Sequence, residues 1–243
     1  MRVIRAFVEG PLSPGQRLTL PEDAAAHLVR VLRLHAGDAC VLFNGDGHDY
    51  AARITAAGKR GVDAEVLSAR AVDNESPLRI TLLQGIARGD KMDWILQKAT
   101  ELGIAAVVPV NSERSEVKLE GQRAGKRVAH WRSVLVSACE QSGRARVPDL
   151  SAPLPLRNAM ADLPDVPRYL LDPAAEQAIA ALPSLPDGCV LAVGPEGGWS
   201  PRDREVLRSA GFTGLRLGPR ILRTETAGIA AIAALQVVVG DLR

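Results

Sequence analysis

Two glycine-rich segments near the end of the chain constrain its fold more than any other feature. The first, residues 194–198, reads Gly-Pro-Glu-Gly-Gly and follows the apolar run 189–193. The second, residues 217–227, follows the short apolar run 214–217. Glycine lets a backbone turn sharply and approach a neighbour closely, so such segments often join a strand to a helix. The pattern predicts two strand–loop–helix units that lie side by side.

Each loop leads into a segment that has the features of a helix start. After the first loop, a Ser-Pro-Arg-Asp sequence that begins at Ser200 combines an N-cap residue, a proline at the first helical position and an acidic residue. After the second loop, Thr224 is the expected N-cap of residues 225–239, which are rich in alanine and apolar on nearly all sides. Such a helix is expected to be buried. Two helix N-termini around one spot suit a nucleotide-like ligand.

Neither loop has the spacing of a common nucleotide motif. The patterns G-x-G-x-x-G and G-x-x-x-x-G-K-[ST] do not fit either segment. Pro195 and Pro219 each remove a backbone N–H donor that a phosphate would need, so the loops favour an uncharged ring or a ribose. Ordinary tight turns are the alternative, which two such loops with capped helices disfavour. The lack of lysine in either loop and of nearby acidic metal ligands counts against a nucleotide-phosphate enzyme.

The two loops resemble the SPOUT superfamily of S-adenosylmethionine-dependent RNA methyltransferases. The matching residues are Gly-Pro-Glu-Gly-Gly-Trp-Ser from Gly194 and Leu-Gly-x-x-Ile-Leu-Arg-x-Glu-Thr-Ala from Leu217. Within the superfamily the pattern is most similar to the RsmE family, which makes N3-methyluridine in 16S ribosomal RNA. The resemblance implies a C-terminal deep trefoil knot that binds the cofactor, an exception to the rule that chains do not thread through loops. It also implies a homodimer, because SPOUT proteins pair two cofactor domains.

The resemblance places the cofactor, S-adenosylmethionine, against the backbone of both loops. The glycines permit close approach of the backbone, and Glu196 is expected to reach a ribose hydroxyl. Apolar side chains would form the walls around the adenine. The expected cofactor-binding residues are Leu171, Asp172, Val193, Gly194, Pro195, Glu196, Gly197, Gly198, Leu217, Gly218, Ile221, Leu222, Thr226 and Ala227.

Methyl transfer to a uridine ring nitrogen requires alignment and a way to stabilise charge. The cofactor brings the reactivity, and the protein aligns the nucleophile with the methyl carbon. Loss of the ring proton leaves negative charge on the flanking carbonyl oxygens, which a fixed cation would stabilise. Arg223 is the first candidate for this catalytic role. Glu225 is a candidate general base, but support of Arg223 or of the helix dipole is the favoured role for it.

Residues 1–72 have the pattern of a small β-rich module. A helix is expected to open at Pro21, and residues 44–47, Asn-Gly-Asp-Gly, signal a hairpin turn. Residues 27–54 resemble the N-terminal PUA-like RNA-binding β-barrel of the same family. Arg5, Arg30 and Arg33 are candidate phosphate contacts there, although a solvated arginine face is the favoured alternative on these residues alone. The expected strands are 2–8, 17–20, 39–43, 50–54 and 62–67.

Residues 73–77 are polar, end in proline and form the expected linker to a second domain, residues 78–243. There apolar runs alternate with helical periodicity, which predicts an α/β domain with a parallel sheet. Lys91 and Lys98 fit solvated helix residues, in a region that the resemblance directs toward RNA or the dimer partner. Arg114 and Arg144 are the RNA contact candidates. The expected strands are 79–83, 105–110 and 168–172, and the expected helices are 92–102, 121–142 and 156–163.

The composition of the chain limits which other classes of function are possible. The net charge of the 243 residues is only +2, so a basic RNA-binding surface must come from an uneven distribution of charge. Three separated cysteines show no metal spacing and indicate a reducing compartment. No apolar run reaches the roughly 20 residues that a membrane helix needs. We expect a cytoplasmic protein without a metal or a membrane partner.

The leading hypothesis is a methyltransferase of ribosome biogenesis that modifies N3 of a specific uridine in 16S ribosomal RNA within the small subunit. One alternative keeps the cofactor and moves the target to a ribose hydroxyl or a transfer-RNA base. Another alternative is a non-catalytic RNA-binding factor of ribosome assembly, which would bind no cofactor.

Overall fold

The computed structural model describes residues 3–58 and 61–242, which form two compact units. The helix Gly121–Ser142 (α3) begins in the second unit and ends in the first. The domain bounds given above, 1–72 and 78–243, stay a prediction. The first unit consists of Met1–Glu75 with Val136–Val147, and the second of Ser76–Leu135 with Pro148–Arg243.

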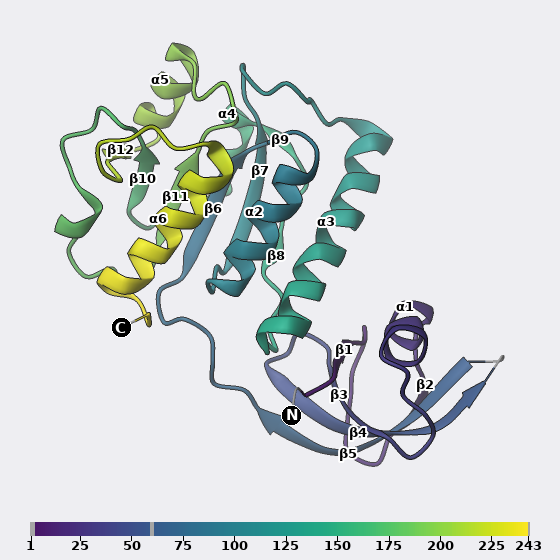
Figure 1. The fold of residues 1–243 in the computed structure, drawn as a ribbon. Coiled ribbons are helices and arrows are strands. Elements are labelled where there is room, and N and C mark those ends of the chain that lie inside the picture. The colour runs from purple at the N-terminus through teal and green to yellow at the C-terminus, as the bar shows by residue number, and fades with distance from the viewer. Residues whose placement is uncertain (1–2, 59–60, 243) are drawn as a thin grey trace. The chain divides into compact units, whose positions relative to one another are not determined.

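A five-stranded sheet forms the first unit, in the order β1-β3-β4-β5-β2 (Figure 1). The pair β1–β3 is parallel, and the other pairs are antiparallel. Alternate residues such as Leu42, Ile54 and Val66 are fully buried in one core with Leu28. The expected strands all form, although β1 is shorter than residues 2–8, and Arg2 lies outside the described residues. The strands are β1 (Arg5–Phe7), β2 (Arg17–Thr19), β3 (Ala39–Phe43), β4 (His48–Gly58) and β5 (Gly61–Ala71).

Local hydrogen bonds shape the β3–β4 hairpin as its sequence predicts. Gly45 and Gly47 have φ of 94° and 96°, the left-handed region that glycine enters without strain. The Asp46 carboxylate accepts hydrogen bonds from the His48 N–H at 2.9 Å and the Tyr50 hydroxyl at 2.6 Å. The bond to Asp46, together with burial, raises the pKa of Tyr50 to about 12.

The helix that opens after Pro21 is irregular. A short α-helix, α1 (Glu22–Ala25), continues directly into a π-helix, η1 (Ala26–Val31). Shortly beyond it, Arg33 has φ of 59°, a conformation that residues other than glycine seldom adopt. The side chains of Arg30 and Arg33 are exposed at this turn.

A seven-stranded parallel sheet forms the second unit, in the order β12-β10-β11-β6-β7-β8, with β9 also paired to β7. The predicted α/β class with a parallel sheet is confirmed. The whole of β11 is buried, as expected for a central strand covered on both faces. The strands are β6 (Ile80–Gly85), β7 (Ala106–Asn111), β8 (Asp149–Leu150), β9 (Leu154–Pro155), β10 (Arg168–Leu171), β11 (Cys189–Val193) and β12 (Phe212–Leu215).

Helices cover both faces of this sheet. Figure 1 shows α2 and α6 side by side across one face, where Gly228 of α6 lies close to Val193 of β11. On the other face, Val190 and Ala192 share a core with α4 and α5. The expected helix 156–163 is shorter than predicted. The helices are α2 (Asp90–Glu101), α3, α4 (Leu156–Ala159), η2 (Ile179–Ala181), α5 (Pro201–Ser209) and α6 (Thr224–Val239).

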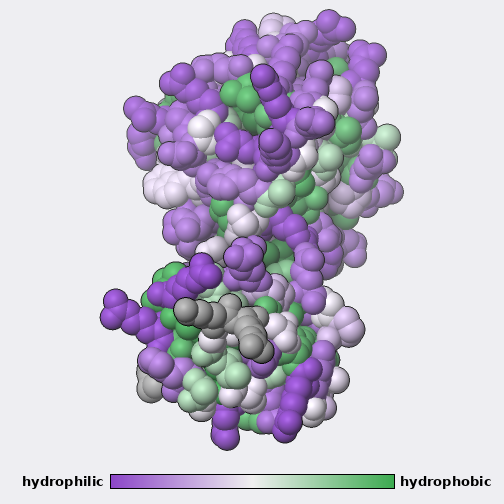
Figure 2. Space-filling model, turned by 90° about the vertical axis from the view of Figure 1, so that its right-hand side faces the viewer, coloured by the Kyte–Doolittle hydropathy of each residue, from purple (hydrophilic) through white to green (hydrophobic). Residues whose placement is uncertain are grey.

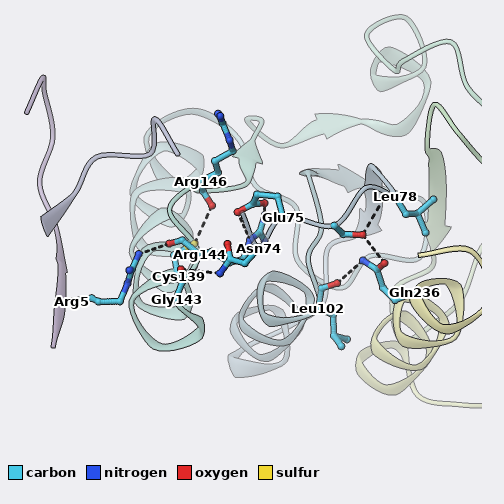
Figure 3. A network of polar contacts seen from close by, with 11 residues as sticks. Arg5, Asn74, Glu75, Leu78, Leu102, Cys139, Gly143, Arg144, Arg146 and Gln236 are labelled. Carbon is cyan, nitrogen blue, oxygen red and sulfur yellow. Dashed lines mark hydrogen bonds and ion pairs between the residues drawn. The ribbon is translucent and has the colours of Figure 1, made fainter. Parts of the chain in front are cut away.

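A buried glutamine anchors the far end of α6, which is otherwise apolar. Gln236 Nε2 donates to the Leu102 carbonyl at 2.8 Å, and its Oε1 accepts from the Ser76 hydroxyl at 2.8 Å (Figure 3). Ser76 Oγ in turn accepts from the Leu78 N–H at 3.1 Å. Because a buried amide is costly unless it is bonded, these contacts fix α6 against the end of α2 and the start of β6.

Hydrophilic side chains cover most of the face shown in Figure 2, where hydrophobic residues form only small groups. This is the distribution expected when the large aliphatic residues form interior cores. In the part of the chain that the structure describes, no helix combines the length and the apolar content that crossing a membrane requires.

The entry to β11 depends on a glycine that has no room for a side chain. Gly188 has φ of 91°, and a Cβ there would lie 2.1 Å from the Arg79 carbonyl oxygen. We expect Gly188→Ala to lower the free energy of unfolding by at least about 2 kcal/mol, because it adds a backbone collision to left-handed strain. Urea denaturation followed by circular dichroism measures the loss.

Gly211→Ala is the matched control for this substitution. Gly211 has φ of 83°, but nothing lies within 4 Å of the position that its Cβ would occupy. The control therefore isolates the cost of the left-handed backbone, about 1–2 kcal/mol. Equal losses in the two variants would contradict the collision at Gly188.

Candidate functional site

A cavity of about 490 Å³ lies at the carboxyl edge of the parallel sheet. Its walls come from the segments that follow β10, β11 and β12 and from the start of α2. Ligands of open α/β sheets bind at this edge, and a volume of about 300–1,000 Å³ is usual for small-molecule sites. The fold therefore presents a site of suitable size where both glycine-rich loops meet.

The predicted catalytic and cofactor-binding residues gather around this cavity with one exception. Both catalytic candidates, Arg223 and Glu225, line it, and so do all the expected cofactor residues except Thr226. Thr226 is exposed and does not line the cavity, so cofactor contact stays a prediction for it. The helical turn directs Thr224 and Glu225 inward and Thr226 outward, which a linear motif does not reveal.

The first loop is a tight turn packed against the end of β6. The Gly198 N–H donates to the Pro195 carbonyl at 2.8 Å, and Gly198 has φ of 65°. A Cβ on Gly85 would lie 2.5 Å from Pro195 Cδ. A Cβ on Gly194 would lie 3.2 Å from the backbone of Gly198. Gly85 lets the proline ring pack directly on the strand end, and Gly194 lets the loop close on itself.

The second loop is tied to the first through Thr224. The predicted N-cap is corrected: Arg223 is the N-cap residue, and Thr224 is the first residue of α6. The Thr224 hydroxyl donates to the Gly194 carbonyl and accepts from Gln84 Nε2 at 3.2 Å. Gln84 is fully buried and also donates to the Gly85 carbonyl at 2.8 Å. The hydroxyl is therefore engaged by distant partners and caps no helix.

The N-cap of α5 agrees with the sequence prediction. Ser200 Oγ accepts from the Asp203 N–H at 3.0 Å, and Asp203 Oδ2 accepts from the Ser200 N–H at 3.1 Å. Pro201 occupies the first turn. This reciprocal capping fixes the direction in which α5 leaves the first loop.

The ammonium group of Lys91 lies between two carboxylates of the cavity. Its Nζ is 3.2 Å from Glu196 Oε1 and 3.9 Å from Glu225 Oε2. The Arg88 N–H also donates to Glu196 Oε1 at 3.2 Å. Burial acts to raise the pKa of Glu196, but backbone N–H groups and Lys91 outweigh it and hold that pKa below its ordinary value.

Sequence reasoning missed Lys91 and Arg204 as cavity residues. Lys91 follows β6, so the rule that ligands bind at the carboxyl ends of parallel strands was a signal that could have found it. Arg204 forms an ion pair with Asp172, whose other oxygen accepts from the Ala174 N–H at 3.1 Å. No local pattern distinguishes Arg204 from the other arginines of α5.

The charges of the cavity are segregated between its interior and its rim. The side chains of Glu225, Asp172 and Glu196 are only 10%, 16% and 18% exposed. The arginines Arg114, Arg220 and Arg223, which also line the cavity, are exposed. Arg114 donates to the Gly197 carbonyl at 3.0 Å. Lys91 and Arg204, 31% and 29% exposed, offset two of the three carboxylates, so the interior keeps a small excess of acidic groups while the rim is basic.

Arg5 and Arg144 are buried and paired within the first unit, and RNA contact stays a prediction for them. Arg5 Nη1 is 2.5 Å from Asp49 Oδ1. Its Nη2 donates to the Arg144 carbonyl at 3.0 Å (Figure 3). Arg144 makes a two-pronged contact with Glu75, at 2.5 Å and 3.2 Å. A buried guanidinium is stable only when it is paired, and these pairs hold the end of α3 within the first unit. Arg30, Arg33 and Arg114 are exposed, so RNA contact stays a prediction for them.

Within the described ranges, no group of three or more histidine, cysteine, aspartate or glutamate side chains is arranged to hold a metal ion. All three cysteines are buried, which raises the pKa of Cys40 to about 11 and that of Cys139 and Cys189 to about 12. Their thiols are protonated at neutral pH and therefore poor nucleophiles.

The hydroxyl of Thr224 is expected to stabilise the meeting of the two loops. Thr224→Val keeps the shape of the side chain but leaves the Gly194 carbonyl without this donor and removes one partner of Gln84. We expect the free energy of unfolding to fall by about 1–3 kcal/mol, as for other buried polar groups that lose a partner. Thr226→Val on the same helix is the control and should stay within about 0.5 kcal/mol of the parent. Urea denaturation compares them, and an equal effect would contradict the role of Thr224.

Models of known protein families match both parts of the chain. An RNA methyltransferase domain matches residues 74–236, and an RNA methyltransferase PUA domain matches residues 20–67. Curated relatives carry the name ribosomal RNA small subunit methyltransferase E. The protein from Buchnera aphidicola subsp. Schizaphis graminum is 32% identical and covers 99% of this chain and 98% of its own. The Bacillus subtilis protein is 34% identical over 86% of this chain and 85% of its own.

Solved structures agree with this assignment. A ribosomal RNA small subunit methyltransferase E from Neisseria gonorrhoeae, bound to S-adenosyl methionine, has a TM-score of 0.92 and 40% identity over 99% of this chain and all of its own. A methyltransferase from Legionella pneumophila, in complex with bound SAM, has a TM-score of 0.96 and 38% identity over the full length of both chains. The chain therefore belongs to the RNA methyltransferases, and among them to the ribosomal RNA small subunit methyltransferase E (RsmE) family.

Proposed function

We propose that this protein transfers a methyl group from S-adenosylmethionine to N3 of a specific uridine in 16S ribosomal RNA of the small subunit. The segregated charge of the cavity carries the proposal. An acidic interior suits a cationic sulfonium cofactor, and a basic rim suits the polyanionic backbone of RNA. The names of the curated relatives and the cofactor bound in the Neisseria structure support the same reaction.

The residues of the cavity fit this cofactor. Leu171, Val193 and Leu222 offer apolar walls for an adenine ring. Glu196 Oε2 and Glu225 Oε2 are buried, and neither has a hydrogen-bond partner among the described residues. Buried acceptors without a hydrogen bond are costly, so both oxygens suit donors that a ligand brings, such as hydroxyl or amino groups.

Arg223 is proposed to stabilise the charge that develops on the uridine. When bound, the cofactor supplies an electrophilic methyl group, and the ring nitrogen attacks it after loss of its proton. The negative charge then spreads over the two carbonyl oxygens that flank the nitrogen. Arg223 is exposed at the rim and is the N-cap of α6, so its guanidinium and the positive end of the helix act together. Glu225 is proposed to support this arrangement rather than to accept the proton.

RNA recognition is proposed to use exposed arginines of both units. Arg30 and Arg33 flank the exposed apolar side chains of Val31 and Leu32 in the first unit. Arg114 lies at the rim of the cavity in the second unit. Arginine binds phosphate oxygens through several donors at once, and nearby apolar groups can contact unstacked bases.

A trefoil knot is proposed for the C-terminal segment. The segment after β12 leaves the edge of the sheet, yet α6 begins against Gly194 and Gln84 at its centre. On this path Arg216 exchanges backbone hydrogen bonds with Gln177 and Ile179 of the β10–β11 connection. We propose that the chain passes through that connection. Tracing the chain in an experimental density map decides this.

A homodimer and a cytoplasmic location complete the proposal. Trp94 on α2 and Val237 on α6 are 53% and 56% exposed, and their helices pack side by side. Apolar residues exposed on paired helices are typical of a surface that another chain covers. Light scattering at micromolar protein concentration gives the mass that tests the dimer, and cell fractionation tests the location.

Isothermal titration with S-adenosylmethionine, together with a methyl-transfer assay on purified small subunits, tests the proposed reaction. The parent protein should bind the cofactor with micromolar affinity and produce N3-methyluridine, detected by mass spectrometry. Arg223→Ala should keep most of the cofactor affinity and lose about 10²–10³-fold in kcat, the usual effect of removing one group that stabilises developing charge.

Arg216→Ala is the control, because Arg216 is exposed on the same segment but does not line the cavity. It should retain parental activity. A folded parent protein that binds no cofactor would contradict the methyltransferase and favour the non-catalytic assembly factor. Loss of cofactor binding in Arg223→Ala would instead mean that Arg223 holds the cofactor loop.

The RNA contacts are tested by the salt dependence of binding. Replacing Arg30 and Arg33 with glutamine should lower the slope of log K against log salt by about one for each lost phosphate contact. Arg33 has φ of 59°, a backbone conformation that strains arginine and glutamine alike. Glutamine is therefore chosen, so that the substitution changes the charge and not the backbone strain. Arg17→Gln is the control, since Arg17 is exposed but paired with Glu65 at 3.3 Å. Unchanged slopes in the Arg30 and Arg33 variants would place the RNA elsewhere.

A further inference from the structure

We infer that Lys91 is a positioning residue for methyl transfer, because its ammonium group ties the two cavity loops together through Glu196 and Glu225. The inference rests on the proposed function. It concerns a residue that belongs to neither glycine-rich loop and that acts through the two carboxylates rather than on the reacting atoms.

Lys91 reaches the cavity from a third segment, the start of α2. Strand β6 ends at Gly85, and α2 begins at Asp90 with Gly89 as its N-cap at φ of 57°. Lys91 is therefore the second residue of α2, and it lines the cavity with its side chain 31% exposed. Most of the side chain is therefore covered by the surrounding residues.

The contacts of Lys91 connect segments that are far apart in the sequence. Its Nζ lies 3.2 Å from Glu196 Oε1 in the first loop and 3.9 Å from Glu225 Oε2 in the first turn of α6. The Arg88 N–H holds the same Oε1 of Glu196 at 3.2 Å. The Lys91 ammonium group thus contacts both loops. The segment before α2 is also bonded to the first loop, through the Arg88 N–H.

The charge balance explains why one lysine matters here. Two sheltered carboxylates within 4 Å of a common nitrogen repel each other when no cation lies between them. Two arginines that line the cavity are otherwise engaged: Arg204 pairs with Asp172, and Arg114 donates to the Gly197 carbonyl. Removal of the Lys91 charge would drive Glu225 away from Glu196.

A shift of Glu225 would also move Arg223, the proposed catalytic residue. Arg223 precedes Glu225 by two residues and is the N-cap of α6, so the first turn of the helix fixes both side chains. Methyl transfer depends on in-line geometry, and a displacement of about 1 Å in an active site can cost about 10²-fold in rate. Lys91 would therefore set the rate through alignment.

The test compares Lys91→Met with Lys91→Arg in the titration and methyl-transfer assays. Methionine keeps the apolar stem and removes the charge, whereas arginine keeps the charge. We expect Lys91→Met to lose about 10²-fold in kcat with a smaller rise in KM for S-adenosylmethionine. Lys91→Arg should recover most of kcat. In the presence of Glu225→Gln, the further loss from Lys91→Met should be much smaller, because the two act together.

Lys98→Met is the matched control. Lys98 lies on the same helix, pairs with Glu101 at 2.9 Å and is 36% exposed, but it does not line the cavity. Equal activity of Lys91→Met and Lys98→Met, or additive losses with Glu225→Gln, would overturn the inference while the parent protein still methylates RNA. A parent protein that binds no cofactor would instead contradict the proposed function. That result would overturn the inference about Lys91 as well. If Lys91→Met does not fold, Lys91→Gln takes its place.

Discussion

The buried amide of Gln84 is the contact on which the rest of the site depends. Its Nε2 donates to the Gly85 carbonyl and to the Thr224 hydroxyl, and that hydroxyl donates to the Gly194 carbonyl. A buried donor destabilises the fold unless it is bonded, and the bonds from Gln84 Nε2 to Thr224 and from the Thr224 hydroxyl to Gly194 form only when the start of α6 lies against the ends of β6 and β11. This polar link and the parallel sheet together hold the two glycine-rich loops beside each other.

The carboxylates and the arginines around the site differ in how deeply they are buried. Inside the cavity, Asp172, Glu196 and Glu225 are sheltered and partly neutralised by Arg204 and Lys91. At the rim, arginines are exposed, although the net charge of the whole chain is only +2. A nearly neutral protein can therefore offer RNA a locally basic surface, because the three carboxylates that line the cavity are sheltered and the rim arginines are not.

Local signals in the sequence predicted most elements, and long-range contacts account for the errors. The bounds of β3, β11 and α3 match the predicted ranges, and the Ser200 cap formed because its partner is three residues away. Thr224 has the same capping chemistry, but its hydroxyl bonds to Gln84, 140 residues earlier. Arg5 and Arg144 look like surface charges until the fold pairs them with Asp49 and Glu75. Sequence patterns contain no information about such partners.

The prolines explain why the site lacks a familiar nucleotide motif. Pro195 gives up a backbone N–H, but its ring packs on Gly85 and closes the wall between β6 and the first loop. A phosphate would need that donor, whereas the proposed cofactor has no phosphate and offers a cation, hydroxyl groups and an apolar ring instead. A loop for such a ligand gains more from a rigid wall and from carboxylate oxygens that accept no hydrogen bond, such as Oε2 of Glu196 and of Glu225, than from a row of N–H groups. The departure from the phosphate-binding pattern thus reflects the chemistry of the ligand that the site is proposed to hold.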